Sequence, residues 1–162
     1  MRKSQEDKKR ELIDGILIAR SSILDLVQRL SPEQLNVAFL GEWSVKDLVA
    51  HLAGWDITNL QAIQEISQGI YPSFFEYYDK DWRTYNARLV AAHKVEPFEA
   101  LLVKLDDSHR RLVTHLESLP ASVILNGKAS RANGRSVTIR NLLKVEAADE
   151  RQHALQLNEF IV

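Results

Sequence analysis

The sequence predicts an all-α fold, a four-helix bundle with a long crossover between the second and third helices. Three observations predict it. Apolar residues recur at helical spacing in four long segments, capping and turn residues bound these segments, and the alternating pattern typical of strands is weak throughout. The length of 162 residues fits one domain with a sizeable core, which we expect to span residues 1–162.

The first helix is predicted over residues 5–30 as one long amphipathic segment. A helix restart follows at Ser31, because Pro32 suits the first helical position and Gln34 stands three residues after the cap. We expect a short turn of helix there and then a loop through Gly41. The apolar stripe of the first helix comprises Leu12, Ile13, Ile16, Leu17, Ile23, Leu24, Val27 and Leu30.

The second helix has a well-defined start. Ser44 is the predicted N-cap, and Asp47 three residues later completes a capping box. Trp43 and Leu48 occupy the two positions of a hydrophobic staple. The helix is predicted to end near Gly69, because glycine is favoured just beyond a helix C-terminus.

The crossover spans residues 70–96 and is rich in aromatic side chains. A structureless stretch of this length is unusual inside a compact domain, so a helix is predicted over residues 74–93. The third helix is predicted to begin at Pro97 and to stop before Pro120, since proline suits a first turn and interrupts a helix interior.

Residues 120–137 contain the turn dipeptides Asn126-Gly127 and Asn133-Gly134. They permit a hairpin, but a plain loop is the prediction. The last helix follows, with Thr138 as its N-cap, and runs to Phe160. Its start resembles that of the second helix, which indicates either an old duplication or two good helix starts of independent origin.

Composition and charge exclude several function classes. Without cysteine the chain offers no disulfide and no thiolate, so any metal must be held by His, Asp or Glu. The net charge of −1 supplies no basic field, and no nucleic-acid partner is expected. No apolar run approaches the ~20 residues that span a bilayer, and no apolar signal region follows the charged N-terminus. We therefore expect a cytoplasmic protein without a membrane partner.

Polar side chains interrupt the apolar face of the last helix. At about 100° per residue, Glu146, Asp149 and His153 fall within about 40° of Leu142, and Glu150 falls within about 80°. Burying unpaired carboxylates is unfavourable, so these groups need a compensating partner. A divalent cation would supply it.

Three of these polar residues form a candidate metal site. Asp149 and His153 stand one helical turn apart and can reach the same ion. His51 flanks the apolar stripe of the second helix and can face the last helix. Two imidazoles and one carboxylate leave positions open for water or substrate, so these three residues are the predicted ligands. Glu146 or Glu150 is the candidate general base if its side chain points inward.

The same residues also permit a structure without metal. A buried Asp149–His153 pair can simply share a hydrogen bond, with Arg151 or Lys144 serving the nearby charges, and His51 can be a satisfied core histidine. His109 lies on the core face of the third helix. It either supports the site or is a hydrogen-bonded histidine at the edge of the core.

Several stretches of the chain resemble the DinB-like (YfiT-like) superfamily. Trp43 to His51, followed by Leu52-Ala53-Gly54-Trp55, is similar to the second helix of that family. Residues 81–88 resemble the crossover of one branch, and residues 101–120 resemble the third helix. Residues 149–156 resemble the last helix, where members usually carry His-x-x-x-His. The resemblance covers nearly the whole chain and is specific in the combination of its motifs.

The resemblance implies an up-down-down-up bundle, often dimeric, in which three residues between the second and last helices hold zinc or nickel. Carried over to this sequence, the three residues are His51, Asp149 and His153. Asp149 stands where histidine is usual. The mycothiol-dependent maleylpyruvate isomerase branch is similar in this respect, because it carries a His, Glu-x-x-x-His arrangement.

Two functions follow as expectations. The first is a metal-dependent hydrolase or thiol-dependent transferase in which a metal polarises a water or thiol nucleophile. It would act on a small molecule, use a small-molecule substrate or thiol cofactor, and form a homodimer. The alternative is a non-catalytic, stress-related module that binds a small ligand or dimerises, with a degenerate metal site.

Overall fold

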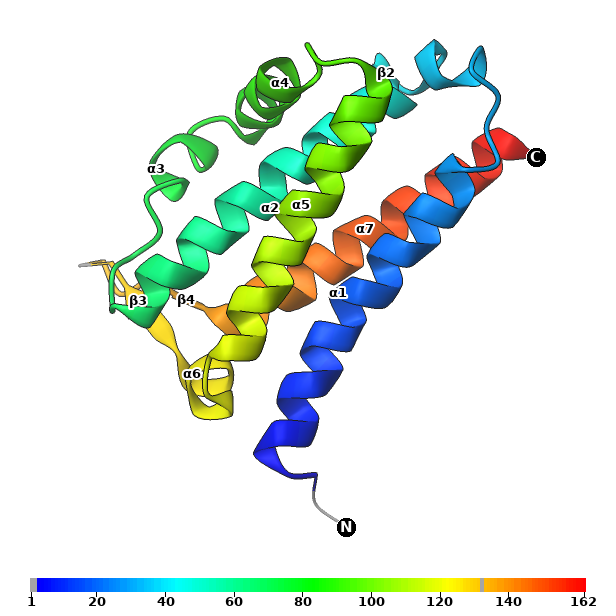
Figure 1. Ribbon diagram of the computed structural model, residues 1–162. Coiled ribbons are helices and arrows are strands. Elements are labelled where there is room, and N and C mark those ends of the chain that lie inside the picture. The colour runs from blue at the N-terminus through cyan, green and yellow to red at the C-terminus, as the bar shows by residue number, and fades with distance from the viewer. Residues whose placement is uncertain (1–2, 132) are drawn as a thin grey trace.

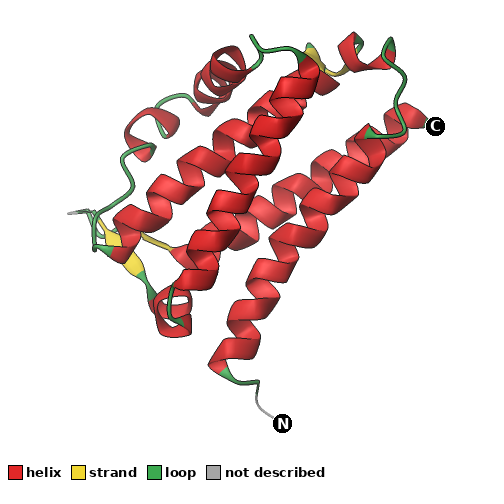
Figure 2. Cartoon of the chain, viewed as in Figure 1, coloured by secondary structure: helices red, strands yellow, loops and turns green. Residues whose placement is uncertain are grey.

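Four long helices form the body of the protein, which a computed structural model describes over residues 3–131 and 133–162. In chain order they run up, down, down and up (Figure 1). The predicted four-helix bundle is confirmed, and helices make up most of the chain (Figure 2). The four are α1 (Gln5–Val27), α2 (Val45–Ser67), α5 (Phe98–Ser118) and α7 (Ile139–Ile161).

Short elements connect the long helices. The predicted restart after the first helix is a single 3₁₀ turn, the segment through Gly41 is a short hairpin, and the crossover holds two helices where one was predicted. In chain order these elements are η1 (Gln34–Asn36), β1 (Ala38–Leu40), β2 (Trp43–Ser44), α3 (Phe75–Tyr78), α4 (Trp82–His93), α6 (Ala121–Asn126), β3 (Lys128–Ser130) and β4 (Ser136–Thr138).

The prediction of a plain loop over residues 120–137 is wrong, because this segment forms α6 and a hairpin of β3 and β4. Ala129 and Val137 pair across the hairpin and are buried, whereas Ser130 and Ser136 are exposed. This alternation suits a two-stranded ribbon with one face on the core. Gly134 has a φ of 83° in the turn, which glycine adopts without strain. Strands of three residues are too short for the alternation to stand out in the sequence.

The caps of α2 and α7 set the start of both helices that carry the candidate site. The Ser44 backbone N–H donates to Asp47 Oδ2 at 2.9 Å, and the Asp47 N–H donates to Ser44 Oγ at 3.3 Å, which confirms the capping box. At α7, the Asn141 N–H donates to Thr138 Oγ1 at 3.1 Å. Local sequence therefore determines where both helices begin.

The core consists of two apolar clusters, one toward each end of the bundle. Every long helix contributes to both clusters, as its apolar stripe predicts. Buried members of the first cluster include Ile16, Ile63, Leu112 and Leu143, and those of the second include Ile23, Leu48, Leu105 and Leu157.

A buried polar layer separates the two clusters, and it consists of Arg20, Asp56, Ser108 and Glu150. One residue comes from each long helix, at a position between members of the two clusters. The Arg20 guanidinium donates to both oxygens of Asp56 at 3.0 and 2.9 Å and to both oxygens of Glu150 at 3.0 and 2.6 Å. Ser108 Oγ donates to Asp56 at 2.8 Å. All four long helices are thus joined at one level.

The crossover packs along α2, remote from α1 (Figure 1). Gly54 permits this close approach, because a Cβ atom there would lie 3.0 Å from Leu89 Cβ. One residue later, Trp55 Nε1 donates to Asn86 Oδ1 of α4 at 2.8 Å. The crossover is therefore held against the part of α2 that carries the candidate site.

We predict that Arg20→Met lowers the free energy of unfolding by about 3–5 kcal/mol, because two buried carboxylates then lose their counter-charge. Urea denaturation at pH 7, followed by circular dichroism, measures the change. Arg29→Met is a matched control, since Arg29 is exposed just beyond α1, and should change stability by less than about 0.5 kcal/mol. Equal losses in the two variants would contradict the role of the polar layer.

Candidate metal centre

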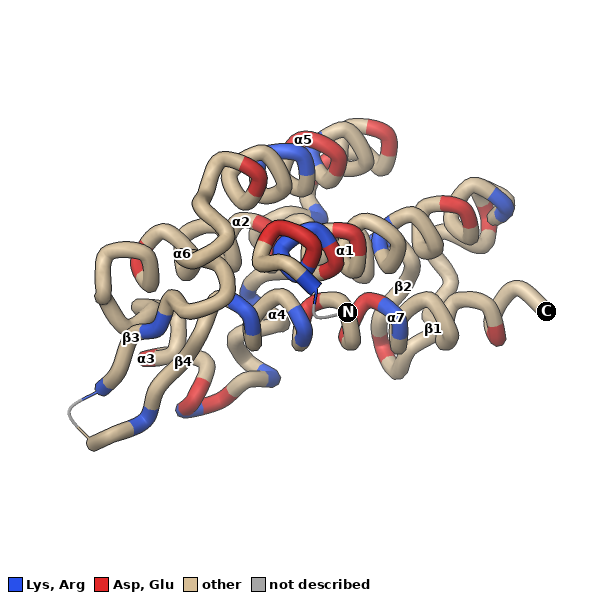
Figure 3. Tube along the Cα trace, turned by 90° about the horizontal axis from the view of Figure 1, so that it is seen from below, with Lys and Arg blue, Asp and Glu red and all other residues tan. Residues whose placement is uncertain are grey.

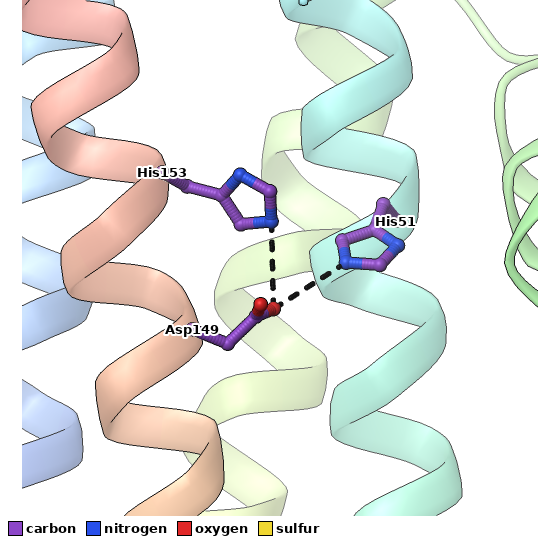
Figure 4. A group of neighbouring side chains, drawn as sticks. All are labelled: His51, Asp149 and His153. Atoms are coloured by element: carbon purple, nitrogen blue, oxygen red, sulfur yellow. Dashed lines mark ion pairs between the residues drawn. The ribbon is translucent and has the colours of Figure 1, made fainter. Parts of the chain in front are cut away.

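His51, Asp149 and His153 converge between α2 and α7 (Figure 4). Asp149 Oδ2 lies 3.7 Å from His51 Nε2 and 3.4 Å from His153 Nε2. Both histidines are buried, whereas the Asp149 side chain is 54% exposed. The structure therefore brings together the three residues that the spacing on α7 and the flank of α2 singled out.

The separations between the three side chains suit a small divalent ion. One donor atom from each residue lies within 4.8 Å of the other two. In a tetrahedral zinc site with metal–ligand bonds of about 2.0–2.1 Å, neighbouring donor atoms stand about 3.3 Å apart. The separations from Asp149 of 3.7 and 3.4 Å are close to that value. Three protein ligands on one side would leave a further position open.

The three side chains shift one another's protonation. Burial and the charge of His153 lower the pKa of His51, against the opposing effect of Asp149. Burial also acts to lower the pKa of His153, but Asp149 and Gln156 outweigh it, and that pKa is raised. Partial burial acts to raise the pKa of Asp149, but the two imidazoles outweigh it and hold it below its usual range. Without an ion, a shared proton therefore belongs on His153.

Gln156 orients His153 from behind. His153 Nδ1 lies 2.8 Å from Gln156 Oε1, and an amide oxygen can only accept, so this bond needs a proton on Nδ1. An outer hydrogen bond of this kind is typical of metal-binding histidines. His51 has no such partner in the part of the chain that the structure describes, where its buried Nδ1 forms no hydrogen bond. Its ring is positioned by packing against Trp43, with ring centroids 4.9 Å apart.

A cavity of about 920 Å³ opens beside the three side chains. Its lining is mostly apolar and comes from α2, α7, the crossover and the two short hairpins. Asn59 and Glu146 add polar groups to the part of the wall where α2 and α7 meet. This size and lining are typical of sites for small organic molecules.

Aromatic side chains make up one wall of the cavity. The rings of Phe74 and Tyr78 lie 5.6 Å from the Trp55 ring, both in edge-on orientation. All three tryptophans of the chain line the cavity, namely Trp43, Trp55 and Trp82. Five aromatic residues of the crossover therefore line the cavity beside the candidate site, namely Tyr71, Phe74, Phe75, Tyr78 and Trp82.

Glu146 and Glu150, the two predicted candidate bases, are both buried, and neither presents a free carboxylate to the cavity. Both oxygens of Glu150 accept hydrogen bonds from Arg20, so that carboxylate is engaged in the polar layer. Glu146 is 7% exposed, and among the described residues neither of its oxygens has a hydrogen-bond partner. Burial, together with the charges of Asp56 and Glu150, raises the pKa of Glu146 well above its usual range. A general base must instead present a free carboxylate to the substrate.

Arg151, Lys144 and His109, which the sequence offered as supporting residues, do not contact His51, Asp149 and His153 through ion pairs within the described residues. Arg151 and Lys144 are exposed, and within the described chain neither forms an ion pair with Asp149. His109 Nδ1 lies 3.6 Å from Asp56 Oδ1, at the edge of the polar layer. His109 is therefore associated with Asp56 and not with the three converging residues.

Sequence reasoning missed Arg20 and Asp56, although their spacing could have revealed them. Arg20 stands four residues after Ile16 and three before Ile23, within the apolar stripe of α1. Asp56 stands in the same way between Leu52 and Asn59. A charged residue at such a position must either be paired with an opposite charge inside the core or remain in contact with solvent.

Two solved structures have a similar fold. The colibactin self-resistance protein ClbS, solved in complex with double-stranded DNA, matches with a TM-score of 0.76 at 19% identity, over 93% of each chain. YfiT from Bacillus subtilis, described as a probable metal-dependent hydrolase with an unusual four-helix bundle topology, matches with a TM-score of 0.69 at 17% identity. That match covers 98% of this chain and 89% of YfiT. A search of the curated proteins found no match.

The prediction that excluded a nucleic-acid partner is wrong, because ClbS has this fold and was solved with double-stranded DNA. Net charge is a sum over the whole chain, whereas duplex binding depends on where individual basic groups lie. Acidic and basic residues are interspersed along the helices of this protein (Figure 3), and the net charge alone does not say where the basic groups lie. Separately, none of the helices within the described residues is long and apolar enough to cross a membrane.

A family model links the fold to the candidate site. The model of the DinB superfamily matches residues 16–157, which include α2 and α5 entirely, parts of α1 and α7, and the three converging residues. This match spans far more than half of the chain and agrees with the bundle seen in the structure. The chain belongs to the DinB superfamily.

Proposed function

We propose that this protein is a metal-dependent enzyme that acts on a small organic molecule, with His51, Asp149 and His153 as the metal ligands. One observation carries the proposal: three potential ligand atoms converge at the wall of a cavity of about 920 Å³. Membership of the DinB superfamily and the likeness to YfiT, a probable metal-dependent hydrolase, support it.

The donor set favours zinc or nickel within this proposal. Imidazole ligands suit both metals, and the chain has no thiolate to offer. When bound, such an ion would act as a Lewis acid toward a water or thiol nucleophile. Gln156 would hold the His153 ring in position, and the aromatic wall would exclude bulk water from the bound molecule.

The reaction class is hydrolysis, or transfer to a thiol cofactor. A thiol nucleophile would have to enter with a cofactor, because the chain has no cysteine. The cavity is large enough for a substrate together with a water molecule, or for a compact substrate beside a thiol. The homodimer implied by the family resemblance belongs to the same proposal, and light scattering tests it.

A non-catalytic ligand-binding module is the second candidate. The ion pairs of Asp149 with His51 and His153 favour it, because they partly satisfy the three side chains without a metal. Asp149 lies close to both imidazoles, so one protonated histidine could stabilise the group without a metal. In that case the cavity would hold a ligand without reaction. Metal content and the response to substitution at Asp149 separate the two candidates.

We predict that the wild-type protein, purified without an affinity tag and supplied with zinc, binds roughly one ion per chain. His51→Ala should reduce the content to background, whereas His115→Gln, a histidine of α5 outside the site, should leave it unchanged. Chelation should also lower the free energy of unfolding, by about 2.7 kcal/mol when free metal had stood 100-fold above its Kd. Unchanged metal content in His51→Ala would show that the proposed ligands are wrong.

We predict that Asp149→His retains zinc within about tenfold of the wild-type affinity, because a third imidazole is a good zinc ligand at this position. Competition with a chromogenic chelator measures the affinity. Asp149→Asn, which keeps the size of the side chain but removes the charged ligand, is the matched control and should bind much more weakly. If Asp149 serves only as an ion-pair partner, the two variants should be destabilised alike and neither should bind metal.

A further inference from the structure

Glu146 is a buried polar group that the proposed metal chemistry does not use. It lies in the middle of α7, one turn before Glu150, and its side chain lines the cavity. It is 7% exposed, and neither oxygen accepts a hydrogen bond within the described chain. Across from it on α2, Asn59 is 5% exposed and lines the same part of the cavity wall.

The charges around Glu146 do not permit a third buried carboxylate. Arg20 of α1 is the one guanidinium in the polar layer, and Asp56 of α2 and Glu150 of α7 occupy it fully. His109 of α5 is the remaining titratable neighbour, and its closest carboxylate partner is Asp56, at 3.6 Å. An ionised Glu146 would therefore face two negative charges without a counter-ion of its own, in a buried position.

A cation at Glu146 is a weaker explanation of the same geometry. Asp56, His109 and Glu146 do present donor atoms within 4.8 Å of one another. However, both Asp56 oxygens already accept from the Arg20 guanidinium, which would lie against any ion bound there. A proton on Glu146 removes the excess negative charge without this repulsion. Burial and the charges of Asp56 and Glu150 raise the pKa of Glu146, and they outweigh Arg20 and Asn59, which act to lower it.

We propose that Glu146 is a neutral carboxylic acid in the folded protein and that, together with Asn59, it donates hydrogen bonds to a carbonyl oxygen of an uncharged aromatic ligand in the cavity. A protonated carboxyl group has an O–H to donate, and the amide of Asn59 has two N–H groups. A buried donor left unpaired is unfavourable, so a ligand acceptor at this wall would gain affinity.

The rest of the cavity supports this class of ligand. Trp55, Phe74 and Tyr78 offer ring faces and edges to an aromatic group. A negatively charged group beside Glu146 would instead lie near Glu150, which lines the same cavity, and near Asp56, whose carboxylate lies within 4.8 Å of Glu146. Glu146 would thus be a positioning residue that binds the ligand while leaving the reacting end near His51 and His153. This inference rests on the proposed function only in taking the cavity as the substrate site.

The protonation of Glu146 has a direct spectroscopic test. The infrared difference spectrum of wild type minus Glu146→Gln at pH 7 should contain the C=O stretch of a carboxylic acid, which shifts in D₂O. Burial also raises the pKa of Glu150, so the band is assigned to Glu146 only if a second variant, Glu146→Leu, loses it as well. Absence of the band overturns the proposal.

Stability against pH gives an independent prediction. The folded protein should bind one more proton than the unfolded chain above the ordinary glutamate pKa of 4.5. Relative to Glu146→Gln, the folding equilibrium constant of the wild type should therefore fall as pH rises from there, by up to about tenfold per unit, and level off above the folded pKa. Urea titrations from pH 4 to 9 measure this, and a pH-independent difference overturns the neutral acid.

Ligand recognition is tested by tryptophan fluorescence with 2-naphthamide as the probe and 2-methylnaphthalene as its match without a carbonyl group. Glu146→Leu should weaken 2-naphthamide about 2- to 10-fold, the contribution of a neutral hydrogen bond, and leave 2-methylnaphthalene unchanged. Glu146→Gln, which keeps a donor, should bind both probes like the wild type. Equal weakening of both probes, or no binding of 2-naphthamide, overturns the assignment.

All of these measurements are made in the presence of a chelator. If the protein binds no metal, these measurements can therefore still support the role of Glu146. If they contradict that role, the metal proposal is unaffected, because it is tested by metal content. The charged probe 2-naphthoate completes the series. If it binds as tightly as 2-naphthamide and depends equally on Glu146, the proposed preference for an uncharged ligand is wrong.

Discussion

The Arg20 guanidinium, with Asp56 and Glu150 on either side of it, is the interaction on which the rest of the structure depends. It lies inside the bundle at 3% exposure and takes part in four charge-assisted hydrogen bonds. Apolar side chains can shift against one another at a small cost in free energy. Separating a buried ion pair costs much more, because it leaves a buried charge without compensation. The polar layer therefore sets the level at which α1, α2 and α7 meet, and Ser108 includes α5 in the same arrangement.

The polar layer positions the side chains of the candidate metal centre. Asp149 and Glu150 are neighbours on α7, so the bond of Glu150 to Arg20 turns Asp149 and His153 toward α2. On α2, His51 stands just over one turn before Asp56, whose position Arg20 also determines. The same contacts that stabilise the bundle thus align the three potential ligands. A substitution at Arg20 should disturb the candidate site without touching it.

Two chemically different groups of side chains line the same cavity. At one place the two imidazoles and the exposed carboxylate of Asp149 present donor atoms for the proposed metal ion, and at another the proposed neutral Glu146 would offer a proton. The cavity also has an aromatic wall, which would shield the polar contacts of a bound molecule from water and so strengthen them. This division suits a substrate that is held at one end and reacts at the other. The crossover, packed on α2 through Gly54 and Trp55, closes the enclosure.

Much of the fold is determined by the sequence alone, because apolar periodicity and capping residues act locally. The stripe of α1, the capping box at Ser44 and the N-cap at Thr138 place the long helices without knowledge of their neighbours. The i, i+4 spacing of Asp149 and His153 likewise puts two potential ligands on one face. Tertiary structure alone decided which buried charges meet, since the partners of Arg20 lie 36 and 130 residues away along the chain. It also decided that Glu150 is engaged and Glu146 is not, because pairing across helices depends on packing that no local pattern encodes.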